Sequence, residues 1–341
     1  MQKRKRILTL FVVFTVLVVC AELVTRQLFP PVEASDLPTP DAGSITLLKG
    51  AAALPKAENA ITIPPLKGVG WGFEPGSIVE QGNIQSPINS LGIRGEEIPK
   101  KQKDEIRFLL LGDSSVFGYG VTTEDTFGEV AATQLQKIVG QDARAVNGAI
   151  PGHSSEQSSL LLREIGAEIA PDFVVIANMW SDIYDGTKPE DAPVSSFALV
   201  RLGTEWLEPW RKPRKISWVY TGADLSAPPE DGPRVALRTY RKNLLQLVEQ
   251  SKALGAKPLF LMLPVPIDMA PGGAPEWLTQ YRLVMEHVAV TQNVPLVDAP
   301  SWFENHNPSA KDFYDNVHPS REGHQKIGMA LAEVLSQQLQ R

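Results

Sequence analysis

The 341-residue sequence has little cysteine and little concentrated positive charge. The first shortage excludes internal disulfides and cysteine-based metal sites, and the second argues against a nucleic-acid-binding protein. Cys20 is its one cysteine, so the chain can form no internal disulfide and no cysteine-based metal site. The formal net charge is -6, and no long basic stripe follows the first six residues, which argues against a nucleic-acid-binding surface. The five histidines show no metal-ligand spacing. We therefore expect no cofactor, no metal and no nucleic-acid partner.

The N-terminus carries the pattern of a targeting segment. Four basic residues, 3–6, precede an apolar run from Ile7 to Ala21. By the positive-inside rule the basic end stays in the cytoplasm and the rest of the chain is exported. A signal anchor over residues 1–25 is our first prediction, because no clean cleavage site follows the run. Cleavage near Cys20 is the second alternative. Lipidation of Cys20 ranks last, because Val19 stands where a lipoprotein signal has a small residue.

Composition divides the remaining chain into three parts. Residues 26–66 are rich in proline and alanine without an apolar period, which predicts a stalk. We predict that residues 67–104 form an N-terminal extension with irregular or hairpin structure. Residues 105–341 predict the main domain, interrupted by a long insertion at 183–233 that contains three tryptophans. That insertion is either a lid or binding loop, or a surface excursion with its own small apolar cluster.

The main domain alternates short apolar runs with amphipathic stretches, which is typical of a parallel sheet covered by helices. We predict a flavodoxin-like three-layer α/β/α fold, with functional groups at the carboxyl ends of the strands. Three helices are expected. The first follows Ser154, where Gln157 completes a capping box. The second runs from about Arg234 to Leu254, where Gly255 ends it, and the third begins near Ser320. The predicted strands are Ile106–Leu111, Ala143–Asn147, Asp172–Asn178, Pro258–Leu263 and Val294–Val297.

A candidate nucleophile follows the first of these strands. The strand ends in Gly112-Asp113-Ser114, so the serine lies at the edge of the sheet that opens to a cleft. Glycine permits a sharp exit from the strand, and Asp113 can hydrogen-bond to the turn. Backbone N–H groups at the start of the next element are free to meet a developing oxyanion. This position makes Ser114 a candidate nucleophile for acyl transfer; the alternative is that Gly-Asp-Ser is only a turn after the strand.

A candidate base lies just before the last predicted helix. In Asp315-Asn316-Val317-His318-Pro319 the carboxylate precedes the imidazole by three residues, in a turn fixed by proline. This spacing lets Asp315 contact one ring nitrogen while the other faces a nucleophile. A serine hydroxyl is a weak nucleophile until a base removes its proton. The pair predicts a catalytic triad with Ser114.

From about Leu91 onward, the insertion apart, the sequence resembles the SGNH/GDSL hydrolase family, in particular its bacterial membrane-tethered branch. Gly112-Asp113-Ser114 matches the family's first block and Asp315-x-x-His318 its last, which implies the triad Ser114, Asp315 and His318. Asn147 to Gly152 resembles the second block, which implies that the Gly152 N–H stabilises the oxyanion. The resemblance also implies the SGNH fold.

The third block departs from the family pattern Gly-x-Asn-Asp. Here the strand is followed by Asn178-Met179-Trp180-Ser181-Asp182, so Ser181 stands in the asparagine position. We expect Ser181 to be the third oxyanion donor, or Asn178 if the strand ends earlier. Losing one such donor costs about 2.7–4 kcal/mol of transition-state stabilisation. The departure bears on rate and substrate more than on fold.

These features predict a serine ester hydrolase held outside the cytoplasmic membrane, periplasmic or extracellular. The expected substrates are acylated small molecules or O-acyl groups of envelope glycans or lipids. Two alternatives stay open. An O-acyltransferase would use the same triad but pass the acyl group to a sugar hydroxyl. A non-catalytic glycan-binding domain on the same fold would account for the missing third-block asparagine.

Overall fold

The computed structural model describes residues 61–63, 72–81, 83–183, 214–216 and 233–340. The predicted anchor, nearly all of the predicted stalk and most of the insertion lie outside these ranges. Within them, no helix has both the length and the apolar character needed to cross a membrane.

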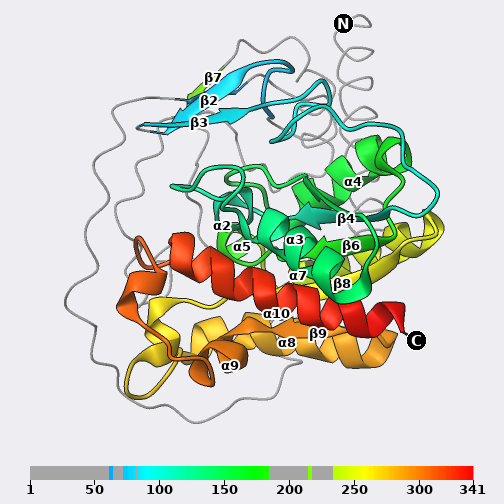
Figure 1. The fold of residues 1–341 in the computed structure, drawn as a ribbon. Helices are drawn as coiled ribbons and strands as arrows, with labels where there is room; N and C mark the ends of the chain where they lie inside the picture. The colour runs from blue at the N-terminus through cyan, green and yellow to red at the C-terminus, as the bar shows by residue number, and fades with distance from the viewer. Residues whose placement is uncertain (1–60, 64–71, 82, 184–213, 217–232, 341) are drawn as a thin grey trace, which may run out of the picture.

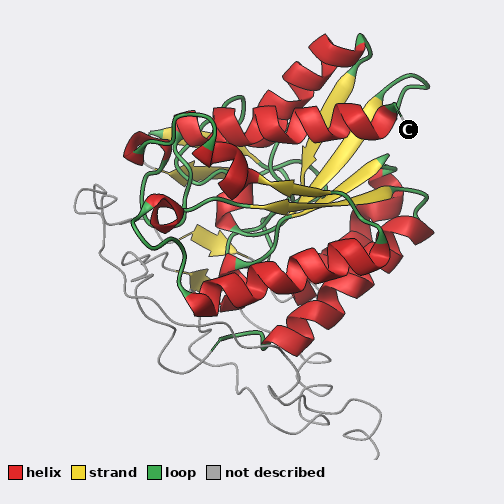
Figure 2. Cartoon of the chain, turned by 90° about the horizontal axis from the view of Figure 1, so that it is seen from below, coloured by secondary structure: helices red, strands yellow, loops and turns green. Residues whose placement is uncertain are grey.

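The central element is a five-stranded parallel sheet in the order β5-β4-β6-β8-β9. In chain order this is the 2-1-3-4-5 arrangement of flavodoxin-like folds. Helices cover both faces, which gives three layers (Figure 2). The strands are β4 (Ile106–Leu111), β5 (Ala143–Asn147), β6 (Phe173–Ile176), β8 (Lys257–Met262) and β9 (Leu296–Asp298).

The helices form two groups. Figure 1 shows the last helix, α10, lying beside α3, and these two pack together. On the other side α4 packs against α7, which in turn packs against α8. The longer helices are α3 (Phe127–Val139), α4 (Ser155–Ile169), α7 (Leu237–Ala253), α8 (Glu276–Gln292) and α10 (Arg321–Leu339); α9 (Ala299–Glu304) is shorter.

The predicted elements are confirmed where local signals were strong. The first two predicted strands coincide with β4 and β5, and the others differ by one or a few residues at their ends. Every residue of β4 is buried, as expected for a central strand covered on both faces. The backbone N–H of Ser154 donates to Oε1 of Gln157 at 3.1 Å, as the capping box predicts. α7 ends just before Gly255.

The N-terminal extension, predicted to be irregular or a hairpin, contains the hairpin β2 (Ile78–Gln81) with β3 (Ile84–Pro87). A second pairing differs from the sequence prediction. Three residues near the end of the predicted stalk form β1 (Ile61–Ile63), which pairs antiparallel with β7 (Arg214–Ile216) in the predicted insertion. The physical reason is local, because β-branched residues in Ile-Thr-Ile favour a strand once a partner is available.

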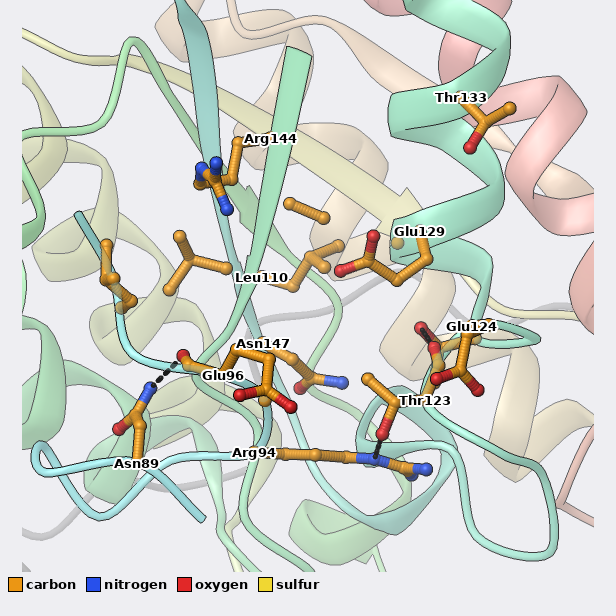
Figure 3. A pocket seen from close by; sticks show the side chains of 16 residues that line it. Asn89, Arg94, Glu96, Leu110, Thr123, Glu124, Glu129, Thr133, Arg144 and Asn147 are labelled. Atoms are coloured by element: carbon orange, nitrogen blue, oxygen red, sulfur yellow. Dashed lines mark hydrogen bonds between the residues drawn. The ribbon is translucent and has the colours of Figure 1, made fainter. Parts of the chain in front are cut away.

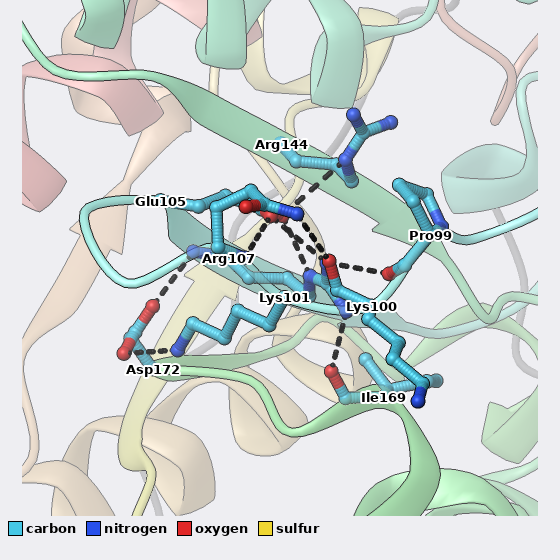
Figure 4. Close-up of polar contacts among 9 residues, drawn as sticks. Pro99, Lys100, Lys101, Glu105, Arg107, Arg144, Ile169 and Asp172 are labelled. Carbon is cyan, nitrogen blue, oxygen red and sulfur yellow. Dashed lines mark hydrogen bonds and ion pairs between the residues drawn. The ribbon is translucent and has the colours of Figure 1, made fainter.

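A buried ion pair lies at the amino end of the sheet (Figure 4). Nε of Arg107 in β4 is 2.7 Å from Oε1 of Glu105, and both side chains are 1% exposed. The guanidinium also donates to the carbonyls of Ile169 at 2.9 Å and Pro99 at 3.0 Å. The pair therefore joins the N-terminal extension, β4 and the end of α4, on the edge of the sheet opposite to Ser114.

Substituting Arg107 tests how far this cluster supports the fold. Without Arg107 the buried Glu105 keeps only Arg144 as a counter-charge, a partly exposed side chain 3.3 Å away, so R107A is expected to lower the free energy of unfolding by about 3 kcal/mol. Urea denaturation measures the change. The exposed pair Arg321–Asp125, at 2.9 Å, provides the control, and R321A should cost no more than about 1 kcal/mol. Equal losses in the two variants would contradict a structural role for the buried pair.

Candidate active site

The strand-to-helix turn after β4 places Ser114 at the carboxyl edge of the sheet. β4 is followed by Gly112, where any Cβ would overlap the side chain of Val116. Asp113 then begins the short helix α2 (Ser114–Phe117), and its Oδ1 accepts from the N–H of Ser115 at 3.1 Å. The sharp exit predicted from Gly-Asp-Ser is therefore present.

The structure brings Ser114, His318 and Asp315 together. Nε2 of His318 lies 2.8 Å from Oγ of Ser114, and Nδ1 lies 2.7 Å from Oδ2 of Asp315. The exposed fractions of the three residues are 3%, 1% and 7% in that order. A carboxylate accepts the Nδ1 proton, so Nε2 is the nitrogen that can take a proton from the serine hydroxyl.

Hydrogen bonds within its own loop fix the Asp315 carboxylate. Oδ1 accepts from the backbone N–H groups of Val317 at 2.8 Å and His318 at 2.7 Å. Burial alone would raise the pKa of Asp315, but His318 and these two N–H groups outweigh it and hold the pKa below the usual range. The carboxylate is therefore ionised at neutral pH and holds the imidazole in one orientation.

Two further contacts join the Asp315–His318 loop to the nucleophile helix. The hydroxyl of Ser115 donates to the carbonyl of Val317 at 3.0 Å. The ring of Tyr119 packs against the ring of His318, with centroids 5.0 Å apart. The backbone N–H of Tyr119 donates in turn to the carbonyl of Ser114 at 3.1 Å. The short 114–119 segment therefore contacts the His318 ring twice, through the Ser114 hydroxyl and through the Tyr119 ring.

A buried histidine anchors α10 behind the loop. Nδ1 of His324 accepts from the backbone N–H of Phe127, the first residue of α3, at 3.0 Å. The two rings stack with centroids 5.5 Å apart. Burial lowers the pKa of His324 to about 3, so the ring is neutral and remains an acceptor. This bond fixes the start of α10, and with it the loop that carries His318, against α3.

Gly152, the predicted oxyanion donor, lies in a tight turn after β5. The N–H of His153 donates to the carbonyl of Ile150 at 3.0 Å. Pro151 and Gly152 are the central residues, and Gly152 has φ 77°, the pattern of a type II turn. The turn therefore needs glycine at position 152. Its N–H as an oxyanion donor remains a prediction.

The two alternative third-block donors occupy different surroundings. β6 ends at Ile176, so both residues follow the strand. The N–H of Ser181 donates to Oδ2 of Asp113 at 2.9 Å, and the Ser181 hydroxyl also bonds to that carboxylate. Asn178 is fully buried, and its Nδ2 lies 3.5 Å from the carbonyl of His153. Ser181 thus faces the nucleophile turn and Asn178 the Gly152 turn.

With this geometry described, comparison with known proteins gives the family. The sequence profile of the GDSL-like lipase/acylhydrolase family matches residues 110–326, more than half of the chain. The chain belongs to this family. The matched segment contains Ser114, Gly152, Ser181, Asp315 and His318, whereas the N-terminal extension lies outside it. A search of curated proteins gives no match.

Three solved structures are similar to this chain at low identity. The crystal structure of TesA is 20% identical with a TM-score of 0.45, covering 68% of this chain and 98% of that one. A lipolytic G-D-S-L family protein from Veillonella parvula is 14% identical with a TM-score of 0.46, covering 68% and 98%. The lipase/acylhydrolase from Enterococcus faecalis is 15% identical with a TM-score of 0.45, covering 68% and 96%.

In this GDSL-like protein a network of buried polar side chains lies next to the Gly152 turn. No motif or spacing in the sequence predicted most of these contacts. Asp182 is fully buried and accepts from the N–H of Ser155 at 3.0 Å and from its hydroxyl at 2.5 Å. Nδ2 of Asn243 donates to the same hydroxyl at 2.9 Å. These bonds attach the start of α4 to the third block.

Arg234, the first residue after the predicted insertion, joins the Gly152 turn, the start of α4 and the third block. Its NH1 donates to the carbonyl of Gly152 at 2.6 Å and lies 3.3 Å from the carbonyl of Ser181. NH2 donates to Oε1 of Gln157 at 2.7 Å. The arginine thus bridges the second and third family blocks. Its acceptors are mainly backbone carbonyls, which no sequence pattern identifies.

Burial perturbs both aspartates in this region. Burial raises the pKa of Asp182 to about 7, although hydrogen bonds from Ser155 act in the opposite direction. Burial also raises the pKa of Asp113, against hydrogen bonds from Ser181 and Ser115. Within the described ranges no three or more histidine, cysteine or acidic side chains form a group suited to a metal ion.

The raised pKa of Asp182 predicts a pH-dependent stability. Its ordinary pKa is 3.8, so between about pH 4 and 7 the folded state holds a proton that the unfolded state has released. Asp182 therefore favours folding most at the acidic end of this window, and this contribution declines as the pH rises to 7. In D182N the free energy of unfolding, from urea titrations across the window, should decline less steeply. Asp113 still titrates in the variant, and parallel profiles for the two proteins would contradict the assignment.

Proposed function

We propose that this GDSL-like protein is a serine ester hydrolase that works through an acyl-enzyme on Ser114. One observation carries the proposal: the Ser114 hydroxyl, the His318 imidazole and the Asp315 carboxylate form a continuous hydrogen-bonded series with distances of 2.8 and 2.7 Å. Their burial supports it further, because electrostatic interactions are stronger where water is excluded.

The series performs acyl transfer in two steps. Oγ of Ser114 attacks the ester carbonyl while Nε2 of His318 takes its proton, and the imidazolium is stabilised by Asp315. The proton then passes to the leaving alcohol, which gives the acyl-enzyme. In the second step His318 takes a proton from water, which attacks the acyl carbonyl. The bond to Oγ of Ser114 then breaks, the acid leaves, and His318 returns the proton to Oγ. The oxyanion is held by the N–H groups of Ser114 and Gly152, together with the Asn178 amide, or with the Ser181 hydroxyl if it rotates away from Asp113, to which both Ser181 donors bond.

The site of action is part of the same proposal. We infer that residues 1–25 anchor the protein in the cytoplasmic membrane with the domain on the outer side, in the periplasm or outside the cell. The support is the basic run 3–6 followed by the apolar run from Ile7 to Ala21. An extracytoplasmic hydrolase of this family meets esters on envelope glycans and lipids, and these are the proposed substrates.

Triad substitutions test the chemistry. Hydrolysis of p-nitrophenyl acetate should fall about 10⁴-fold or more in kcat/KM for S114A and H318A, because each removes a reacting group. D315N should lose a similar factor, because it favours the wrong imidazole tautomer. H306A is the matched control, since His306 is an exposed histidine whose ring stacks on Trp302. Native rates in S114A would rule out the proposed nucleophile.

The fate of the acyl group separates hydrolysis from transfer. With a sugar acceptor present, a hydrolase releases one acetate for each p-nitrophenol. A transferase instead leaves the acetyl group on a sugar hydroxyl, and that product would replace the hydrolase assignment while keeping Ser114 as nucleophile. Absence of turnover by the folded native chain with esters of every chain length would contradict both.

A further inference from the structure

The N-terminal extension contains a turn that presents one arginine to the nucleophile loop. The segment Asn89-Ser90-Leu91-Gly92-Ile93-Arg94 lies outside the family-matched residues. Oδ1 of Asn89 accepts from the N–H groups of Leu91 at 3.0 Å and Ile93 at 3.3 Å, which closes the turn. Arg94 follows and forms isolated bridges with Ile88 and with Asn147 at the end of β5. The turn therefore aims the arginine side chain into the domain.

Arg94 is buried, and the acceptors of its guanidinium are mainly backbone carbonyls. NH1 donates to the carbonyls of Phe117 at 2.7 Å and Gly118 at 2.8 Å, and NH2 donates to that of Val121 at 2.7 Å. Nε lies 3.3 Å from Oγ1 of Thr123, a contact drawn in Figure 3. Burial lowers the pKa of Arg94 to about 10, so the side chain stays charged at neutral pH.

These acceptors belong to the end of α2 and the loop after it. A four-residue helix has little stability of its own, because forming the first turn of a helix is unfavourable. A cation at the C-terminus of a helix bonds to carbonyls that have no partner within the helix. Arg94 donates to such a carbonyl, that of Phe117, at the end of the helix that begins with Ser114.

Two other residues of the extension contact the same segment. The rings of Phe73 and Phe117 lie with centroids 5.3 Å apart. Oε1 of Gln81, at the end of β2, accepts from the N–H of Gly120 at 3.0 Å. The extension therefore contacts the segment 117–121 through a guanidinium, an aromatic ring and an amide. Tyr119, in the middle of that segment, packs on His318.

We propose that Arg94 is a positioning residue, which holds α2 and Tyr119 so that the Ser114 hydroxyl meets the His318 imidazole. The inference rests on the proposed function and deepens it. It makes the N-terminal extension, which the family profile does not cover, part of the catalytic scaffold. A small displacement at a reacting group is enough for this effect, since a shift of about 1 Å can reduce a rate about 10²-fold.

The test measures turnover per competent site in the full chain. R94M removes all the hydrogen bonds of the guanidinium while keeping much of its apolar volume. R94K keeps the charge, but a single ammonium group cannot donate to three diverging carbonyls as the planar guanidinium does. Active sites are first counted by titration with a p-nitrophenyl phosphonate, and kcat and KM for p-nitrophenyl acetate are then expressed per titrated site.

We expect R94M to lose about 10²-fold in kcat per titrated site with KM close to native, and R94K to lose less. R107K is the matched control, because Arg107 is also a buried arginine bonded to carbonyls, but at the opposite edge of the sheet. It should lower stability and keep native kcat per site.

Native kcat per titrated site in R94M, however few molecules are folded, would overturn the positioning role and leave a structural one. If R94M yields no folded protein, R94K is judged by the same criterion. A native chain that neither turns over ester nor reacts with the phosphonate would overturn the proposed function, and this inference with it. The two failures are therefore distinguishable.

Discussion

The hydrogen bond between Ser114 and His318 is the contact on which the rest of the site depends. It joins residues 204 positions apart, at 2.8 Å, so it exists only if the ends of the domain fold against each other. β4 lies inside the sheet between β5 and β6, which places Ser114 at the carboxyl edge. α10 packs along α3, and the neutral His324 fixes its start there. The loop that carries His318 is thereby held over the nucleophile.

Around that contact, the loops are fixed by buried polar groups rather than by apolar packing alone. Asp113 bonds to Ser181, Asp182 to Ser155, and Arg234 to the carbonyl of Gly152. Each bond links two loops that follow different strands. Burying carboxylates raises their pKa and opposes folding at neutral pH, so these groups favour defined geometry over stability. Catalysis benefits, because donors fixed in advance need not reorganise during the reaction.

The sequence predicted those parts of the molecule that local patterns specify. The strands β4 and β5, the capping box at Ser154 and the pairing of Ser114 with His318 were all accessible, because apolar periods and spaced polar residues encode them. Arg94 and Arg234 were not, because their partners are mostly backbone carbonyls of distant segments. The pairing of β1 with β7 was missed for a related reason, since two three-residue strands carry almost no periodic signal.

Detection of the covalent intermediate tests the central claim most directly. Acid quenching of the full chain during turnover of p-nitrophenyl butyrate, followed by intact-mass and peptide analysis, should find one butyryl group attached to the peptide that contains Ser114. The adduct should be absent from the serine-to-alanine variant at that position. Continued hydrolysis with no adduct at any quench time, or with the butyryl group on another residue, would contradict the account.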